Sequence, residues 1–242
     1  MKAVILAGGA GTRMRPLTYV VPKVLLPIAG KPLLEHTIRY LKAFGIKEFV
    51  VCVAYLKKQI IDEFQDGSEL GVKIEYAEWD LPLGTGGQLK TAESHIDDTF
   101  LAMNGDIVTS LNVQNLINIH KARAGIGTIA LKKFDVKIPY GFVSINETRI
   151  TKFEEKPTLS YMANAGIYIL EPDIFGHIAK EKVVSLETEI FPQLLSKGEE
   201  LYSYFEDAYW SDVGSMADFE RVNNEALSNG SLGVPQEQTS RD

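Results

Sequence analysis

The residues best suited to chemistry lie near the N-terminus, where glycines and basic side chains follow an apolar run. Residues 3–7 predict a buried strand. Directly after it the chain reads Gly8, Gly9, Ala10, Gly11, Thr12 and Arg13. Glycine lacks a Cβ atom, so the main chain can approach a polyphosphate closely and direct several N–H groups at its oxygen atoms. A phosphate-binding loop is therefore predicted, against the alternative of an ordinary tight turn with a solvated basic face.

The distribution of charge supports phosphate binding. Among residues 1–34 every charged side chain is basic, and the first acidic residue is Glu35. The basic residues are Lys2, Arg13, Arg15, Lys23 and Lys31. The whole chain nevertheless has a formal net charge of -7. A local positive field in an acidic protein favours a small, highly charged anion over a nucleic-acid groove, so no nucleic-acid partner is expected.

Two other glycine motifs do not fit this stretch. A Walker A loop requires Lys-Ser or Lys-Thr after its last glycine, and neither pair follows Gly11 or Gly30. A dinucleotide-binding loop requires a third glycine and an acidic residue about twenty positions later, and both are missing after Gly9 and Gly11. The second mismatch argues against an NAD-dependent oxidoreductase.

The N-terminal motif, in residues 8–13, 15–18, 22–23 and 25–27, resembles the signature of nucleoside triphosphate:sugar-1-phosphate nucleotidyltransferases, also called nucleotide-sugar pyrophosphorylases. In that family the loop holds the triphosphate, which implies that Arg13 and Lys23 bind its phosphates. The resemblance assigns nucleotide contacts to Leu6, Ala7, Gly8, Gly9, Gly11, Thr12, Arg13 and Lys23. Met14 and Val24 differ from the residues that are common in the family at these positions, but neither residue carries a charge. The resemblance extends over residues 1–227.

A second glycine cluster, at residues 84–87, stands at a predicted strand-to-helix junction. It predicts contact of the backbone with a base or ribose, and a flexible loop before a helix at residues 88–94 is an equal alternative. The family resemblance implies nucleotide contacts from Gly84 and Thr85. In the resembled family, a Pro-Leu-Gly-Thr-Ala-Gly segment at this place is typical of mannose-1-phosphate guanylyltransferases. Here Gly86 replaces the alanine, as also occurs in heptose-phosphate and cytidylyl branches, so the base stays open.

Two aspartates at the ends of predicted strands could hold a metal ion. Asp106 follows an apolar run, and Asp212 stands where a late strand gives way to a helix. Open α/β sheets bind ligands at the carboxyl ends of their strands, and Mg²⁺ is held by one or two carboxylates plus phosphate oxygens. A common turn for Asp106 and a helix cap for Asp212 are the simpler alternatives. The resemblance makes both aspartates ligands of Mg²⁺.

A third group of residues could bind a sugar phosphate. Glu155 and Lys156 share a loop with Pro157, and Asn164 follows a few residues later. An isolated Glu–Lys pair is usually a surface ion pair of little energetic value. Here Pro157 stiffens the backbone, and Asn164 offers both a donor and an acceptor, as a sugar hydroxyl requires. The resemblance implies that Gly141, Glu155 and Asn164 contact the sugar and that Lys156 binds its phosphate.

The pattern of elements predicts an α/β fold with a mixed, mostly parallel sheet covered by helices on both faces. Predicted strands cover residues 3–7, 47–54, 72–78, 99–103, 126–131, 140–145, 167–170 and 201–205. Predicted helices cover residues 32–44, 57–64, 88–94, 112–125, 171–180, 187–197 and 216–227. Near residue 140 the helices between strands are missing, so we expect this part of the sheet to close over the second substrate. The resemblance implies a Rossmann-like three-layer α/β/α architecture.

Length and composition predict one domain at residues 1–228 and a flexible tail at residues 229–242. The single Cys52 lies in an apolar run and is expected to be a buried structural thiol, which fits a reducing cytosol. His120 is expected to be solvated on its helix. The chain shows no leader and no apolar stretch of membrane-spanning length, so a cytoplasmic protein without a membrane partner is predicted.

These features together predict transfer of a nucleoside monophosphate from a nucleoside triphosphate to a sugar 1-phosphate, with release of pyrophosphate. Arg13, Lys23, Asp106 and Lys156 are the expected catalytic residues, with Mg²⁺ as cofactor. GTP with mannose 1-phosphate is the first substrate pair. Glucose 1-phosphate with dTTP, UTP or CTP, heptose 1-phosphate with GTP, and a non-catalytic subunit that senses nucleotide sugars are the alternatives. The sequence leaves open whether the chain forms a homo-oligomer.

Overall fold

The computed structural model describes residues 1–81 and 83–229, and its centre is a mixed sheet of seven strands in the order β12-β8-β11-β6-β1-β4-β5. Four strands of this sheet, β1, β4, β5 and β6, run parallel to one another. Only β11, among the strands of this sheet, runs antiparallel to its neighbours, and β8 and β12 are again parallel. The strands are β1 (Ala3–Leu6), β4 (Glu48–Val53), β5 (Lys73–Glu78), β6 (Phe100–Asn104), β8 (Gly127–Lys137), β11 (Thr158–Leu170) and β12 (Leu201–Phe205).

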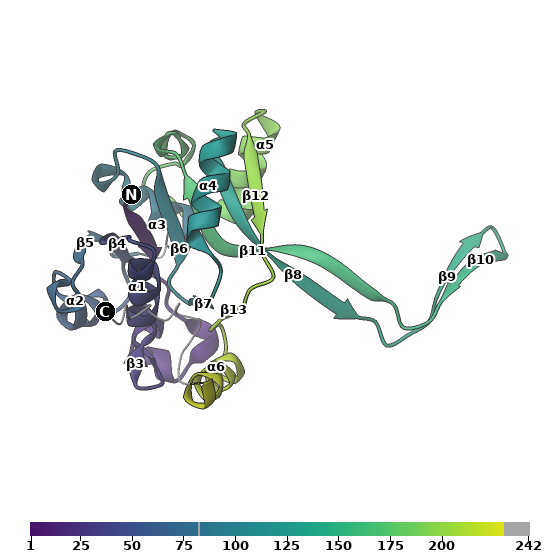
Figure 1. Ribbon diagram of the computed structural model, residues 1–242, viewed down its shortest axis with the longest axis horizontal. Helices are drawn as coiled ribbons and strands as arrows, with labels where there is room; N and C mark the ends of the chain where they lie inside the picture. Colours follow the sequence, from purple (N-terminus) through teal and green to yellow (C-terminus); the bar gives the residue numbers. More distant parts are fainter. Residues whose placement is uncertain (82, 230–242) are drawn as a thin grey trace, which may run out of the picture.

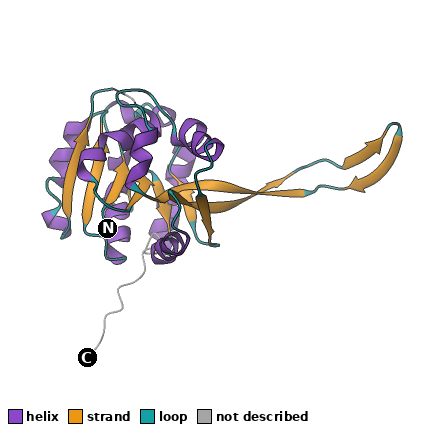
Figure 2. Cartoon of the chain, turned by 90° about the horizontal axis from the view of Figure 1, so that it is seen from above, coloured by secondary structure: helices purple, strands orange, loops and turns teal. Residues whose placement is uncertain are grey.

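Helices cover both faces of this sheet, and Figures 1 and 2 show the resulting layers. In β1, alternate residues point to opposite faces, so Ala3 and Ile5 join one core cluster while Val4 and Leu6 join another. The first cluster includes side chains of α1 (Leu33–Ala43), α2 (Lys57–Phe64) and α4 (Val113–Arg123). The second includes side chains of α3 (Gly84–Thr91) and α5 (Phe191–Ser196). The expected three-layer α/β/α architecture is therefore confirmed.

A third, smaller core supports the loops at one end of the sheet. It joins Met14 and Ile28 to Val108, Val213 and Val222. The elements around it are β2 (Pro27–Ile28), β3 (Lys31–Pro32), β7 (Ile107–Thr109), β13 (Trp210–Asp212) and α6 (Met216–Asn229). Because β7 and β13 pair with each other, this core ties the segment after β6 to the C-terminal part of the domain.

Several predicted boundaries are correct, and others change. The helix at residues 57–64 and the strand at residues 201–205 have the predicted limits. The second glycine cluster is not a loop before a helix, because α3 already begins at Gly84. The helix predicted at residues 171–180 is a 3-10 helix, Pro172–His177, and the one at residues 187–197 is a π-helical turn, Leu186–Ile190, followed by α5.

Two buried side chains test the expectations for single residues. Cys52 is a free, buried thiol whose pKa is raised to about 12 by burial, which confirms a structural role. His120 was expected to be solvated, and this is wrong. Its ring is 2% exposed and lies between Thr128 Oγ1 at 3.0 Å and the carboxylate of Glu171 at 2.8 Å. Polar partners behind the helix allow a histidine to be buried without loss of hydrogen bonds.

The largest departure is a long arm formed by residues 132–163. The strands β8 and β11 continue beyond the sheet as a ladder that pairs Lys132 with Ala163 and Lys137 with Thr158. A hairpin of β9 (Phe142–Asn146) and β10 (Arg149–Glu154) forms its tip. Figures 1 and 2 show the arm projecting away from the body of the domain. We expected this part of the sheet to close over the second substrate, but the structure shows it extended away from the body of its own chain.

Residues 230–242 of the predicted tail lie outside the described residues. Among the helices that the structure describes, none combines the length and the apolarity that a membrane span requires.

Candidate active site

A cavity of about 170 Å³ lies where β1 and β6 end. It brings together five of the predicted nucleotide residues and one predicted metal ligand, from segments far apart in the sequence. Those residues are Leu6, Ala7, Gly9, Lys23, Thr85 and Asp106, and the remaining lining residues are Val24, Gln88 and Asn104. The cavity occupies the carboxyl end of the parallel strands, which is where open α/β sheets bind ligands.

An ion pair between the Lys23 ammonium and the Asp106 carboxylate lies in this cavity. Lys23 begins a 3-10 turn, Lys23–Leu25, that is anchored by the buried side chain of Val24. Asp106 occupies the turn between β6 and β7. The two side chains are only 15% and 21% exposed, so solvent screens their charges less than it would on an open surface. The cavity thus offers one cation and one anion at fixed positions.

The second predicted metal ligand, Asp212, is brought to Asp106 by strand pairing. The ladder of β13 and β7 sets Asp212 opposite Ile107, the residue after Asp106. The backbone N–H of Val213 donates to the carbonyl oxygen of Asp106 at 2.9 Å. The two aspartates therefore occupy neighbouring backbone positions, although they are far apart in the sequence.

The donor set around Asp106 suits a magnesium ion that is shared with a phosphate. Among the described residues, no cluster of three or more His, Cys, Asp or Glu side chains could enclose a metal by itself. Mg²⁺ needs only one or two carboxylates when phosphate oxygens and waters complete its shell. The Oδ1 atom of Asn104 is buried beside Asp106 and has no hydrogen-bond partner in the part of the chain that the structure describes. A water of a hydrated cation, or an N–H of a nucleotide, would supply the missing donor.

Arg13 lies at the edge of the same site. Gly11, with φ of 58°, adopts a left-handed conformation and starts the 3-10 turn Thr12–Met14. Met14 is fully buried in the third core, while Arg13 is exposed. A Cβ atom on Gly214 would lie 3.0 Å from Nη2 of Arg13 and 2.9 Å from Oδ2 of Asp212. The glycine therefore allows the guanidinium and this carboxylate to converge on one point.

The predicted glycine loop is only partly open to a ligand. The N–H of Gly8 donates to Oε1 of Gln88 at 2.9 Å, so it is already used within the protein. Around the Cβ position of Gly9 the structure has no heavy atom within 4 Å, and Gly9 lines the cavity. Backbone contact with a ligand is thus most accessible at Gly9.

A hydrogen-bond network that the sequence did not predict joins the two sides of the site through Glu187. Its carboxylate accepts from Thr85 Oγ1 at 2.7 Å and from Ser185 Oγ at 2.9 Å. It also accepts from the hydroxyl of Tyr168 at 3.2 Å. Tyr168 in turn accepts from Nδ2 of Asn164 at 2.8 Å. Burial, followed by the charge of Glu187, raises the pKa of Tyr168, so its hydroxyl stays protonated as a donor.

These additional residues differ in how visible they are in the sequence. Gln88 follows the second glycine cluster directly, and Asn104 stands two residues before Asp106, so proximity to a motif could have indicated both. Glu187 has no such signal, because its partner Thr85 is about a hundred residues away in the chain.

Comparison with known proteins agrees with this geometry. A family model described as nucleotidyl transferase matches residues 2–229. The chain belongs to the nucleotidyl transferase family. It is 37% identical over 226 residues to the mannose-1-phosphate guanylyltransferase of Mycobacterium tuberculosis, an alignment that covers 90% of this chain and 62% of that protein. It is 34% identical over 238 residues to the UTP–glucose-1-phosphate uridylyltransferase of Synechocystis, covering 90% of this chain and 61% of that protein. The chain thus spans about three fifths of the length of these curated relatives.

Solved structures show the same fold. HddC from Yersinia pseudotuberculosis, in a complex with GMP-PN, superposes with a TM-score of 0.74 and 26% identity. The superposition covers 93% of this chain and 98% of HddC. The Rossmann-like fold of nucleotide-diphospho-sugar transferases is therefore shared along nearly all of the described chain.

The predicted sugar-phosphate residues of this nucleotidyl transferase are divided between the body and the arm. Asn164 stays near the cavity. Its Oδ1 accepts from the N–H of Gly166, and a Cβ on Gly166 would lie 2.7 Å from Nδ2 of Asn104, which lines the cavity. Gly141, Glu155 and Lys156 lie together on the arm. A Cβ on Gly141 would lie 2.6 Å from Glu155 Oε2, and the ammonium of Lys156 is 4.0 Å from Glu155 Oε1. None of these three arm residues lines the cavity.

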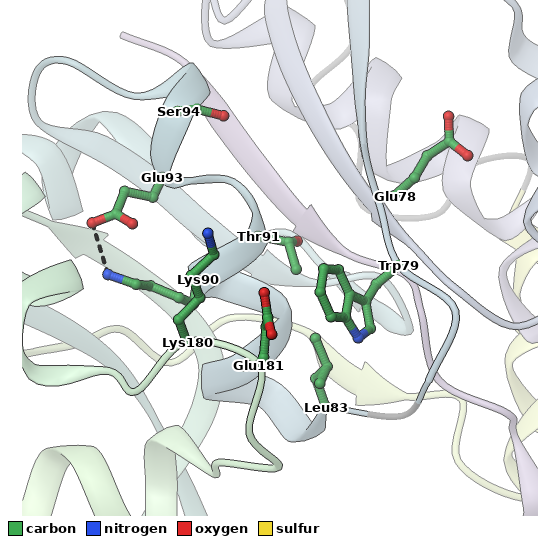
Figure 3. A pocket seen from close by; sticks show the side chains of 10 residues that line it. Glu78, Trp79, Leu83, Lys90, Thr91, Glu93, Ser94, Lys180 and Glu181 are labelled. Atoms are coloured by element: carbon green, nitrogen blue, oxygen red, sulfur yellow. Dashed lines mark hydrogen bonds and ion pairs between the residues drawn. The ribbon is translucent and has the colours of Figure 1, made fainter.

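A larger cavity of about 260 Å³ lies elsewhere, beside α3 (Figure 3). Trp79 and Leu83 form part of its wall, and Glu78, Glu93 and Glu181 place three carboxylates around it. Lys90, the central cation, already donates to Glu93 at 2.7 Å and to the carbonyl of Phe175 at 2.8 Å. The cavity near Asp106 is the better candidate for catalysis, because it places the Lys23–Asp106 ion pair beside the glycine loop, with Asp212 and Arg13 close to it.

Proposed function

We propose that this chain transfers a nucleoside monophosphate from a nucleoside triphosphate to a sugar 1-phosphate and releases pyrophosphate. The observation that carries the proposal is the cavity near Asp106. It gathers residues from the glycine loop, from the turn of Lys23, from α3 and from the end of β6, with Asp212 and Arg13 at its edge. Membership of the nucleotidyl transferase family supports the same reaction.

The chemistry requires positioning and charge neutralisation more than an activated side chain. The phosphate oxygen of a sugar 1-phosphate is already a nucleophile, so no serine or cysteine nucleophile and no general base is needed. Arg13 can bind two phosphate oxygens at once, while Lys23 acts as a point charge on the triphosphate. Lys156 neutralises the sugar phosphate. Two anions can then approach in line, and the preorganised cations stabilise the charge that develops in the transition state.

Asp106 and Asp212 would hold the magnesium ion of the magnesium–triphosphate complex. When bound, the ion supplies further charge neutralisation on the phosphates. Lys23 would then exchange its contact with Asp106 for contacts with phosphate oxygens, because the ion takes over the neutralisation of the aspartate.

For the substrate pair we propose GTP and mannose 1-phosphate. Two relatives named as mannose-1-phosphate guanylyltransferases are 37% identical to this chain. A relative named as a glucose-1-phosphate uridylyltransferase is 34% identical. The assay of substrates therefore also includes the other pairs of nucleoside triphosphate and sugar 1-phosphate.

A matrix of nucleoside triphosphates against sugar 1-phosphates, with Mg²⁺ and detection of released pyrophosphate, tests the proposal. We expect one dominant pair and a loss of at least about 100-fold in Asp106→Asn, which removes one charge from the centre of the site. Asp97→Asn is the matched control, because the side chain of Asp97 is 88% exposed and lies outside the cavity. Binding of nucleotides without pyrophosphate release from any pair would instead favour a nucleotide-sugar-sensing subunit.

A further inference from the structure

We propose that two copies of this chain exchange their arms, so that Gly141, Glu155 and Lys156 of each copy complete the sugar-phosphate side of the other copy's active site. The inference rests on the proposed function, because it concerns where that function's second substrate is bound. Three observations carry it: the reach of the arm, the apolar face of its tip, and exposed apolar side chains on body segments that adjoin the predicted nucleotide-binding residues.

The arm holds three predicted sugar-phosphate residues out of reach of their own cavity. The paired strands β8 and β11 are extended from Leu131 and Asn164 to Lys137 and Thr158. With a rise of about 3.3 Å per residue, Thr158 lies roughly 20 Å from Asn164, and Lys156 lies beyond it. No lysine side chain can span that distance. In the conformation shown in Figure 1, the arm can serve only a site outside its own body.

The tip of the arm has one apolar face that is open to solvent. Ile145 pairs with Ile150, and Val143 pairs with Phe153, so these four side chains share a face of the hairpin. Their exposed fractions are 66%, 59%, 46% and 66% in that order. An isolated two-stranded hairpin is marginally stable in water, and a contiguous exposed apolar face marks an interaction site. The tip is therefore built to pack against protein.

Exposed apolar side chains also occur on two segments of the body that adjoin predicted nucleotide-binding residues. Tyr19 and Val20 lie in the segment between Arg13 and Lys23, at 57% and 67% exposed. Val183, at 71% exposed, precedes Val184, whose carbonyl oxygen accepts from the N–H groups of the second glycine cluster. A tip that covered these side chains would bring Glu155 and Lys156 to the site that lacks them.

A second copy of this chain would supply the missing sugar-phosphate residues and would also cover the apolar tip of the arm. A two-fold axis makes the exchange reciprocal, so that each arm fills the partner's site and both apolar faces are covered. Exchange of an identical element between protomers needs no new type of contact. The trio on the arm is already assembled, because Gly141 and Lys156 both lie next to Glu155. The partner would thus receive a preformed half-site.

Subunit complementation tests the proposal directly. Asp106→Asn removes a body residue and Lys156→Ala removes an arm residue, so at low sugar 1-phosphate each variant alone should keep no more than about a tenth of wild-type activity. After co-expression of the two variants, half of the dimers are mixed and each mixed dimer has one intact site. We expect recovery of about a quarter of wild-type pyrophosphate release. Activity no higher than that of the separate variants would overturn the proposal, because it would mean that each arm serves its own chain.

A cross-linking experiment separates failure of this inference from failure of the proposed function. One chain carries Lys156→Cys and the other Val20→Cys, and a short bismaleimide is added to their mixture. Cys52 is buried and its pKa is raised to about 12, so it should not react. We expect a covalent heterodimer whether or not pyrophosphate is released. A single chain with both substitutions is the control: if it cross-linked internally while the mixture gave no covalent heterodimer, the exchange would be overturned.

A third experiment changes the apolar tip and measures the molar mass in solution by light scattering. Ile145→Asp should convert the dimer to a monomer and lower the activity with it. Leu195→Asp should leave both unchanged, since Leu195 is 62% exposed on α5, away from the arm. Dimers that persist in Ile145→Asp would contradict the role of the tip.

Discussion

The two halves of the candidate site are built in opposite ways. On the body, Lys23 and Asp106 are 15% and 21% exposed and stand on short turns that are anchored in the core. On the arm, Lys156 and Glu155 are 69% and 61% exposed, on a ribbon of two strands. The side proposed to bind the triphosphate is fixed by the packing of one domain. The residues proposed to bind the sugar phosphate lie on a long ribbon, so their position relative to the cavity depends on how that ribbon is held.

This difference matters for catalysis because charge stabilisation is strongest when the charged groups are fixed and poorly solvated before reaction. The body side satisfies that condition by itself. The arm side would satisfy it only after its tip is packed and its cations are brought beside Asn164. The two halves should therefore respond differently to substitution and to protein concentration.

The largest contrast is expected in stability. Phe100 is fully buried and stacks on Phe175 with ring centroids 5.4 Å apart, so Phe100→Ala should lower the free energy of unfolding by about 3–5 kcal/mol. Phe142 on the arm is 50% exposed, and Phe142→Ala should change that free energy by less than about 0.5 kcal/mol in dilute protein. Chemical denaturation measures both. Equal losses would show that the arm is covered within a single chain.

The next contrast is kinetic and compares two lysines of the arm. Lys156→Ala should lower kcat/KM for the sugar 1-phosphate by about 10- to 100-fold, or about 1.4–2.7 kcal/mol, because it removes a cation from the sugar phosphate. The affinity for the triphosphate should not change. Lys152→Ala is the control, since Lys152 is similarly exposed and pairs with Glu154. A loss confined to triphosphate binding would contradict the assignment of Lys156.

A smaller effect is expected at Glu187, where the body network reaches towards Asn164. Glu187→Gln keeps the size of the side chain but weakens the acceptor for Thr85 and Tyr168, at a cost of about 1–2 kcal/mol in the free energy of unfolding. Because the network joins both sides of the site, KM should rise for both substrates. Thermal denaturation and steady-state kinetics measure these effects, with the exposed Glu199→Gln as control. A change in KM for one substrate alone would show that the network does not join the two sides.

The smallest effect concerns pH. The hydrogen bond from Lys73, and next that from His95, lowers the pKa of Glu75 to about 2 from its ordinary value of 4.5. Since the folded state favours the ionised form, this contribution is present above pH 4.5 and is lost as the pH falls towards 2. Glu75→Gln should therefore reduce stability by less than about 1 kcal/mol at neutral pH, and the difference from wild type should vanish in acid.

An ion pair on the arm serves as the comparison for the pH effect of Glu75. Glu154→Gln breaks the exposed Lys152–Glu154 pair and should change stability even less. Denaturant midpoints measured across pH for both variants check the two statements. A difference for Glu75→Gln that grew in acid would reverse the sign of the argument.

Local sequence patterns were sufficient to predict most helices and strands of the body. The helix at residues 57–64 follows from its own periodicity, because Ile60 and Phe64 recur at helical spacing and are both buried. The strand at residues 201–205 is a short run rich in aromatic residues, which favour strands. His120 was misjudged because its polar partners, Thr128 and Glu171, belong to other elements. A buried polar side chain can be recognised only when its partners are known.

The same limit applies to the site. The sequence by itself determined which residues could bind phosphate and metal, because their types and the glycines around them are local properties. Only the tertiary structure decided which of these residues meet. It placed Asp212 beside Asp106 through the pairing of β13 with β7, and it linked Thr85 to Glu187 across about a hundred residues. It also separated Lys156 from Asn164, although they are close in the chain. The physical reason is that a strand keeps neighbours in sequence far apart, while a sheet brings distant segments into contact.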